Sequence, residues 1–182
     1  MALNSGNVRV AVTGAVRVAE TSATPPTDAE TVPEGFADLG YVSDDGVTET
    51  RDRSTEQIRA WQNAAVLREV VTEASVSYQL TLVETNKDTV ELYYGSAVDP
   101  VDGSIVIDPA KTGGRKSYII DVIDGEEVIR TYIPEGEITE VGEQSYASSE
   151  PVGYEVTITA YPSQALGGNS VKKFYSSLVV DN

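Results

Sequence analysis

The chain has 182 residues, 40% of them hydrophobic, which predicts one globular domain with a core of its own. It contains neither Cys nor His, which excludes structural disulfides, thiolate metal sites and mechanisms that need a Cys or His nucleophile or base. Its formal net charge of −16 makes binding to nucleic-acid phosphates unfavourable.

The N-terminal part predicts an arm, strand structure and a loop. We expect residues 1–7 to be an arm that becomes ordered only on assembly. In residues 8–19 valines alternate with other residues, and the text VRVA occurs twice. This pattern predicts either a hairpin turning at Thr13 and Gly14 or one long strand with a bulge at the glycine. Three prolines then predict a loop over 21–35.

Residues 38–62 combine charges of both signs with the only Trp of the chain. The alternation in 47–53 predicts an exposed strand. Two structures are open for the residues that follow. Ser54 and Gln57 have the spacing of a helix capping box, whereas an extended arm would lead directly into a strand at 66–72. We favour the extended arm.

The next elements have clearer patterns. Residues 75–84 predict a strand with one apolar and one polar face. Residues 85–95 predict a short helix, with Thr85 as its N-cap and Gly95 as its stop. A helix of about ten residues is marginal alone, so we expect it to dock on a sheet.

The second half of the chain predicts further strands. A strand is expected at 104–109, a hairpin at Asp124-Gly125, a strand at 152–161 and a C-terminal strand or arm within 163–182. Roughly eight strands and one helix predict a mainly β fold in one domain, 1–182. We expect an antiparallel β-sandwich or open barrel with one short flanking α-helix.

The sequence offers no pattern for catalysis or for a cofactor. In TGGRKS, Arg115 stands where a phosphate-binding loop needs glycine, and DPVDG at 99–103 lacks the distal Glu of a calcium loop. We therefore expect no enzymatic activity, no catalytic residues, no cofactor and no metal. No apolar run approaches the roughly 18–20 residues that span a bilayer, so we expect no membrane partner.

Three long phrases in the first half of the chain and one short phrase near its C-terminus carry a family resemblance. They are DLGYVSDDGVTET, EQIRAWQ and REVVTEASVSYQLTLVETNKDTVELYYG within residues 10–95, and KKF at 172–174. Through them the chain resembles the major tail tube proteins of long, non-contractile-tailed bacteriophages of actinobacterial hosts. The strong match covers nearly half of the chain, and the remainder fits through strand order and acidic hairpins.

The resemblance implies a structural virion protein of the tail, made and assembled in the host cytoplasm. It implies hexameric rings, in which each subunit gives strands to a continuous inner β-barrel, and stacking of the rings into a tube. The implied partners are other copies of the chain, the tape measure protein inside the tube, and the tail terminator and the baseplate or tail-tip proteins at its ends. DNA is expected to pass through without specific binding.

A hexamer would concentrate negative charge around its bore. Six chains of −16 give about −96 per ring, and such a lumen would repel DNA phosphates. The acidic residues expected to face the lumen are Glu137, Glu140, Glu143 and Glu155.

The resemblance also implies that residues 44–66 form a long loop that reaches a neighbouring subunit or ring. Trp and Arg are enriched where interfaces bind tightly. The alternative is that the single Trp packs in its own core. The residues expected to make these contacts are Arg51, Arg53, Glu56, Arg59 and Trp61.

Two other functions compete with this interpretation. The chain could be the inner tube protein of a contractile tail or of a related secretion system, which contacts with a sheath would reveal. It could also be a carbohydrate- or receptor-binding β-sandwich module. Such modules need exposed aromatic residues over a groove, and most of the tyrosines here fall within predicted strands.

Overall fold

The computed structural model describes residues 3–179, which form eight strands, one α-helix and three short 3₁₀ turns. The helix is α1 (Lys87–Tyr94), and the 3₁₀ turns are Ser5–Asn7, Gln164–Leu166 and Ser176–Leu178. The strands are β1 (Thr13–Ala19), β2 (Ala37–Asp38), β3 (Val42–Arg59), β4 (Val66–Leu82), β5 (Lys116–Asp124), β6 (Glu127–Val141), β7 (Tyr154–Ala160) and β8 (Lys172–Tyr175).

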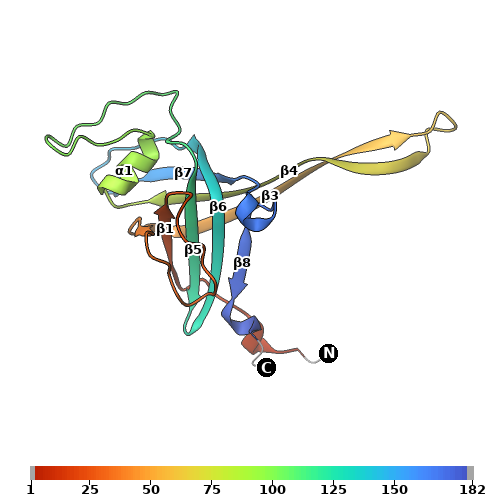
Figure 1. Cartoon of the computed structure of the whole chain (residues 1–182), viewed down its shortest axis with the longest axis horizontal. Coiled ribbons are helices and arrows are strands. Elements are labelled where there is room, and N and C mark those ends of the chain that lie inside the picture. The colour runs from red at the N-terminus through yellow and green to blue at the C-terminus, as the bar shows by residue number, and fades with distance from the viewer. Residues whose placement is uncertain (1–2, 180–182) are drawn as a thin grey trace.

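All of these strands belong to one antiparallel sheet, in the order β2-β1-β5-β6-β7-β4-β3, with β8 also beside β6. β6 joins the two halves of the sheet, because its first part pairs with β5 and its last part, from Gly136 onward, pairs with β7. In Figure 1 β1, β5 and β6 run across the direction of β7, β4 and β3. The prediction of a mainly antiparallel β fold with one flanking helix is confirmed.

The core lies between the two halves of the sheet. Alternation in β4 and β7 follows the predicted pattern, since Tyr78, Leu80, Val156 and Ile158 are buried while the residues between them are exposed or half-buried. The buried residues of this core are Val16, Val18, Leu39, Tyr78, Leu80, Leu82, Leu92, Tyr118, Ile120, Ile133, Ile138, Tyr154, Val156, Ile158 and Ala160.

The outer face of β5 and β6 is also buried, because the loop before β2 crosses it. Arg130 is 2% exposed and donates to the backbone oxygens of Asp28 and Thr31 in that loop, at 3.2 and 2.5 Å. Its guanidinium also makes two hydrogen bonds to Asp121, of 2.7 and 3.0 Å. A buried charge requires this kind of full pairing.

Helix α1 closes one end of the core. The predicted N-cap, Thr85, is wrong by one residue. Asn86 is the N-cap, since its side chain accepts from the backbone N–H of Thr89 at 2.9 Å and donates to the oxygen of Leu39 at 3.2 Å. The predicted stop is confirmed, because Gly95 has φ 63° and ends the helix in the left-handed conformation.

Two other local predictions differ from the structure. Residues 8–12 form neither a hairpin nor part of a strand, although the N–H of Val12 bonds to the oxygen of Ile123 at 3.2 Å. The strand expected at 104–109 is reduced to a single bridge at Ile105, because the chain there forms an exposed loop. Of the two structures left open for the residues after Ser54, the favoured extended one is found, because β3 continues to Arg59, and the helix is wrong.

Candidate functional site

The β3–β4 hairpin is longer than the sheet that supports it. β7 accompanies β4 only from Leu82 back to Val76, which faces Arg51 of β3. In the part of the chain that the structure describes, residues 52–59 of β3 pair with β4 alone. At about 3.3 Å per residue, this distal part adds roughly 26 Å of two-stranded ribbon. It points away from the body in Figure 1.

The tip of the hairpin presents the single tryptophan to solvent. Residues 60–65 connect the strands, and Trp61 is 97% exposed. The N–H of Ala65 bonds to the oxygen of Gln62 at 3.3 Å, and the two residues between them, Asn63 and Ala64, have φ 54° and 52°. These values describe a tight turn of the kind that fits a twisted hairpin. The alternative that Trp61 packs in the core of its own chain is therefore wrong.

The other predicted contact residues lie along the same hairpin. Arg51, Arg53, Glu56 and Arg59 are all exposed. Arg51 is paired within its strand, with Glu49 at 2.6 Å, and Arg59 donates to the Gln57 side chain at 2.6 Å. Strand alternation puts the three arginines on one side of the ribbon and Glu56 on the other.

The half of the sheet formed by the end of β6, β7, β4 and β3 has one core face and one polar face. Glu137 faces Thr159, and Glu140 faces Thr157, so both glutamates project from the same side as Glu155. This polar face thus brings together three of the four acidic residues predicted for the lumen. The fourth, Glu143, lies just beyond the end of β6.

Hydrogen bonds organise the polar face. The hydroxyl of Thr112 donates to Glu137 at 2.6 Å, the amide of Gln79 donates to Glu155, and the hydroxyls of Thr139 and Thr159 are 2.7 Å apart. The strand segments that build this face, 42–50, 75–81, 137–141 and 154–160, contain no Lys or Arg. The face is therefore acidic with no cation of its own.

Two edges of this half-sheet are unpaired within residues 3–179. β3 is the last strand in the order, so its outer edge has no neighbour. β6 loses β5 as a neighbour after Gly136, so residues 137–141 pair with β7 only. Unpaired edges are positions where another strand can add to a sheet.

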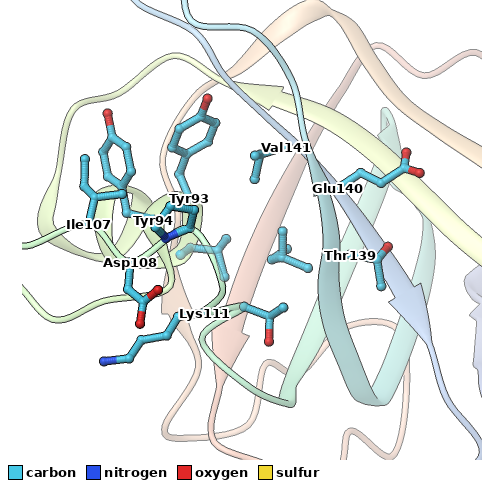
Figure 2. A pocket seen from close by; sticks show the side chains of 12 residues that line it. Tyr93, Tyr94, Ile107, Asp108, Lys111, Thr139, Glu140 and Val141 are labelled. Atoms are coloured by element: carbon cyan, nitrogen blue, oxygen red, sulfur yellow. The ribbon is translucent and has the colours of Figure 1, made fainter.

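A pocket lies beside the unpaired edge of β6. It has a volume of about 350 Å³ and is lined by residues 92–94 of α1, by 107–109, 111 and 112 of the following loop, and by 138–141 of β6. In Figure 2 Tyr93, Tyr94 and Asp108 lie on the helix and loop side of the pocket and Val141 on the β6 side, while Glu140 extends from β6 away from the tyrosines. We call it the α1–β6 pocket.

The two tyrosines of the α1–β6 pocket are held in place. The Tyr93 hydroxyl donates to the oxygen of Gly142 at 2.7 Å, and the Tyr94 hydroxyl donates to Gln144 at 2.9 Å. Burial raises the pKa of both hydroxyls, so both are neutral donors near pH 7. Their rings meet edge to face, with centroids 4.9 Å apart.

Most basic residues outside the hairpin are paired within the chain. Arg115 binds Glu135 at 2.7 Å and stacks over Tyr161, and its hydrogen bond lowers the pKa of the Glu135 carboxyl. Lys173 is bound to Glu49. These side chains contribute to the fold of one subunit.

The buried pair of Arg130 and Asp121 was missed by sequence reasoning, although a signal existed. The hairpin at Asp124-Gly125 is confirmed, and Asp124 faces Glu127 across it. Counting three residues outward on each strand brings Asp121 opposite Arg130. Opposite charges at facing positions of a predicted hairpin indicate an ion pair.

Neither a metal cluster nor a membrane-spanning helix is found among residues 3–179. No group of three or more Asp or Glu there could hold a metal ion. No helix in that range is long and apolar enough to cross a membrane.

A family model described as "Phage tail tube protein" matches residues 1–172 of the chain. The chain belongs to the phage tail tube protein family. The match spans the residues of the exposed hairpin, the polar face and the α1–β6 pocket.

Two solved structures are also similar to this chain at low identity. One is the sheath–tube complex of PVC, an extracellular contractile injection system, in its extended state. It has 10% identity and a TM-score of 0.49, and the match covers 94% of this chain and 98% of that chain. The other is the crystal structure of an Hcp protein, with 9% identity, a TM-score of 0.34, and coverage of 88% and 96%. No curated protein sequence matches the chain.

Proposed function

We propose that the protein is the structural subunit of a phage tail tube, assembling as hexameric rings that stack into a conduit for DNA. Its partners are then other copies of itself, the tape measure protein inside the tube, and the terminator and tail-tip proteins at its ends. The tail is of the long, non-contractile type. The role is structural and requires no catalysis, metal or cofactor. The family match across residues 1–172 is the observation that carries this proposal.

The two unpaired sheet edges support assembly into a ring. The outer edge of β3 and residues 137–141 of β6 lie at opposite sides of the same four-stranded half-sheet. Pairing of β3 from one subunit with β6 of the next would continue that half-sheet around a ring. Closure would leave no free strand edge in the half-sheet. Free edges promote aggregation, and a closed barrel removes them.

The polar face supports an acidic lumen. In a closed ring one face of the half-sheet must cover the core and the other must face the bore. Glu137, Glu140 and Glu155 share the face that is away from the core, and we propose that they and Glu143 face the lumen. Carboxylates there would repel DNA phosphates, so the genome could slide without binding.

The distal hairpin supports contacts between subunits. An isolated two-stranded ribbon is marginal in water, and a fully exposed Trp at its tip gains nothing from the folding of its own chain. We propose that Arg51, Arg53, Glu56, Arg59 and Trp61 contact a neighbouring subunit or ring.

Electron microscopy of the purified, concentrated protein tests the proposed function. The expected result is tubes with sixfold end views. Monomers that persist at every concentration would contradict it.

Substitution of Trp61 tests the role of the hairpin. Trp61→Ala is expected to raise the concentration needed for tubes by about 30-fold, which corresponds to the roughly 2 kcal/mol of an interface hot spot. Trp61→Phe should retain much of the effect. Sedimentation measures the assembled fraction, and normal assembly of Trp61→Ala would remove Trp61 from the interface.

A further inference from the structure

One side of β4 is apolar from the core outward into the part of the hairpin that the sheet no longer supports. Leu80 and Tyr78 are buried on this side, and Val76, where the pairing with β7 ends, is half-buried. Ala74 is the next residue on the same side, and it is exposed. The apolar row therefore runs past the last core residue, and within residues 3–179 nothing buries its outer end.

A β-bulge returns a further apolar residue to this side. Arg53 faces Ala74 and Thr55 faces Val71, so β4 has one residue more than β3 between these two pairs. Facing residues project from the same side of a sheet, so all four lie together, and Val71 is 49% exposed. Without the extra residue, Thr72 would take the place of Val71. We call Arg53, Thr55, Val71 and Ala74 the core side of the hairpin base.

The opposite side of the hairpin base is polar and acidic. Asp52 faces Ser75 and Ser54 faces Glu73, and all four residues are exposed. On β4, Ser75 continues the spacing of two that Gln79 follows on the polar face. We call these four residues the polar side of the hairpin base. The base thus repeats the two faces of the half-sheet from which it extends.

Charge separates the two sides in the same sense. Arg53 is the one charged residue of the core side, whereas the polar side has Asp52 and Glu73. Within residues 3–179 Arg53 makes no ion pair. The hairpin tip beyond the base, residues 58–68, has two arginines and no acidic residue. An apolar surface with a free cation fits an acidic partner, and a second copy of this chain, with a net charge of −16, is acidic.

We propose that the core side of the hairpin base packs on the acidic body of a second copy of this chain, while the polar side continues the wall of the bore. This inference rests on the proposed tube function and adds which side of the hairpin meets each environment. In an antiparallel sheet with one packed face, the other face is the solvated one. Because two-stranded ribbons twist strongly, the assignment applies to the base and does not extend to the tip.

Cysteine labelling tests the two sides, because the chain has no cysteine of its own. Ala74→Cys marks the core side and Ser75→Cys the polar side, and the two positions are adjacent, small and exposed in the single subunit. Each variant is assembled with an excess of wild-type protein, which does not react with maleimide and forms the tubes. The rate of reaction with a maleimide dye is measured in tubes and in subunits diluted below the assembly concentration. Thr55→Cys and Ser54→Cys repeat the comparison on β3.

All four variants should react at similar rates as free subunits. In tubes we expect Ala74→Cys and Thr55→Cys to react at least about 10-fold more slowly, since a thiol buried in an interface is inert. Ser75→Cys and Ser54→Cys should keep most of their rate. Maleimide beads wider than a tube should consume Ser75→Cys in free subunits but not in tubes, because only the dye can enter the bore.

Three results in samples that contain normal tubes would overturn the inference and leave the tube function standing. They are equal dye rates on the two sides, protection of the polar side alone, and consumption of Ser75→Cys by the beads. If the wild-type protein forms no tubes, both the function and the inference fail.

Discussion

At the scale of single residues, the interior depends on one buried charge network. Arg130 contacts Asp121 and two backbone oxygens of the loop before β2, and Arg17 also binds Asp121, at 2.7 Å. The network ties β1, β5, β6 and that loop together. Removing Arg130 would leave Asp121 buried with Arg17 as its only partner, and breaking part of a buried charge network costs more than the intact contact contributes.

We expect Arg130→Ala to lower the free energy of unfolding by about 3–5 kcal/mol, because Asp121 then stays buried with only Arg17 as its partner. Urea unfolding of the monomer measures the loss. The control is Lys87→Ala, which removes an exposed pair with Glu91, 3.9 Å apart, and should cost no more than about 0.5 kcal/mol. Similar losses in the two variants would show that the buried network has no special role.

Glu49 gives the monomer a defined pH dependence. Partial burial raises the pKa of its carboxyl, but hydrogen bonds from Lys173 and Arg51 outweigh this and hold the pKa below the usual value of 4.5. A lowered pKa means that the native state binds its proton less readily than the unfolded chain. The stabilisation is therefore complete above pH 4.5 and is lost as the pH falls through the native pKa.

We expect Glu49→Gln to reduce the stability gained between about pH 3 and about pH 6 by up to about 1 kcal/mol. Unfolding of wild type and variant at both pH values measures this, and the other carboxylates cancel in the comparison. An unchanged pH dependence in the variant would mean that Lys173 and Arg51 do not stabilise the ionised carboxyl.

At the scale of elements, the β3–β4 hairpin has a proximal part that packs on the core of the subunit and a distal part, residues 52–75, that does not. No residue of 52–75 is buried. Replacing residues 54–73 by Asn-Gly joins Arg53 to Ala74, which already face each other, through a turn suited to a hairpin.

We expect the shortened protein to fold with a free energy of unfolding within about 1 kcal/mol of wild type, because it loses no core residue. It should form no tubes at concentrations where wild type assembles. Circular dichroism with urea unfolding measures the fold, and sedimentation measures assembly. Loss of folding would show that the distal ribbon supports the subunit itself.

The sequence predicted the elements that have one face on the core. In 75–84 and 152–161 burial alternates with the residue number, and this period is visible without a structure. The distal hairpin has no buried face, so its pattern favoured a helix from Ser54 as readily as a strand. The loop at 104–109 has apolar residues without a sheet neighbour, and β propensity alone could not exclude a strand there.

The candidate surfaces divide in the same way. The side from which Glu137 and Glu155 project follows from strand alternation. Trp61 was identified as a contact residue because it is the only Trp of the chain and lies in the segment that carries the resemblance. The α1–β6 pocket could not be predicted, because it is formed by a helix, a loop and a strand edge from separate parts of the chain. Only the register of β6 and the path of the loop bring Tyr94 and Asp108 together.

At the scale of the whole molecule, charge is distributed unevenly. The hairpin tip carries positive charge, while the polar face and most of the remaining surface carry the excess of 29 acidic over 13 basic residues. Repulsion between acidic bodies opposes assembly, and the basic tip offsets it at one place. This combination favours one orientation of neighbours over others.

The final prediction concerns the charge of the lumen. Glu137→Lys, Glu140→Lys and Glu155→Lys together shift each chain by +6 and place the new cations on the polar face. Tubes of this variant should retain a short DNA duplex present during assembly and protect it from nuclease, with an affinity that falls steeply as salt rises. Wild-type tubes should retain none.

The control for this prediction has the same net charge with the changes elsewhere: Glu30→Lys, Glu126→Lys and Glu150→Lys are exposed and lie outside the polar face. Any DNA that tubes of the control bind is expected on their outer surface, where nuclease reaches it, so these tubes should not protect it. Sedimentation followed by nuclease digestion separates the two outcomes. If the control protects DNA as well as the lumen variant does, or if the lumen variant forms tubes that retain no DNA, the three glutamates do not face the bore. Protection by the lumen variant alone would place them there, and the acidity of the chain would then have its physical role as the wall along which DNA slides.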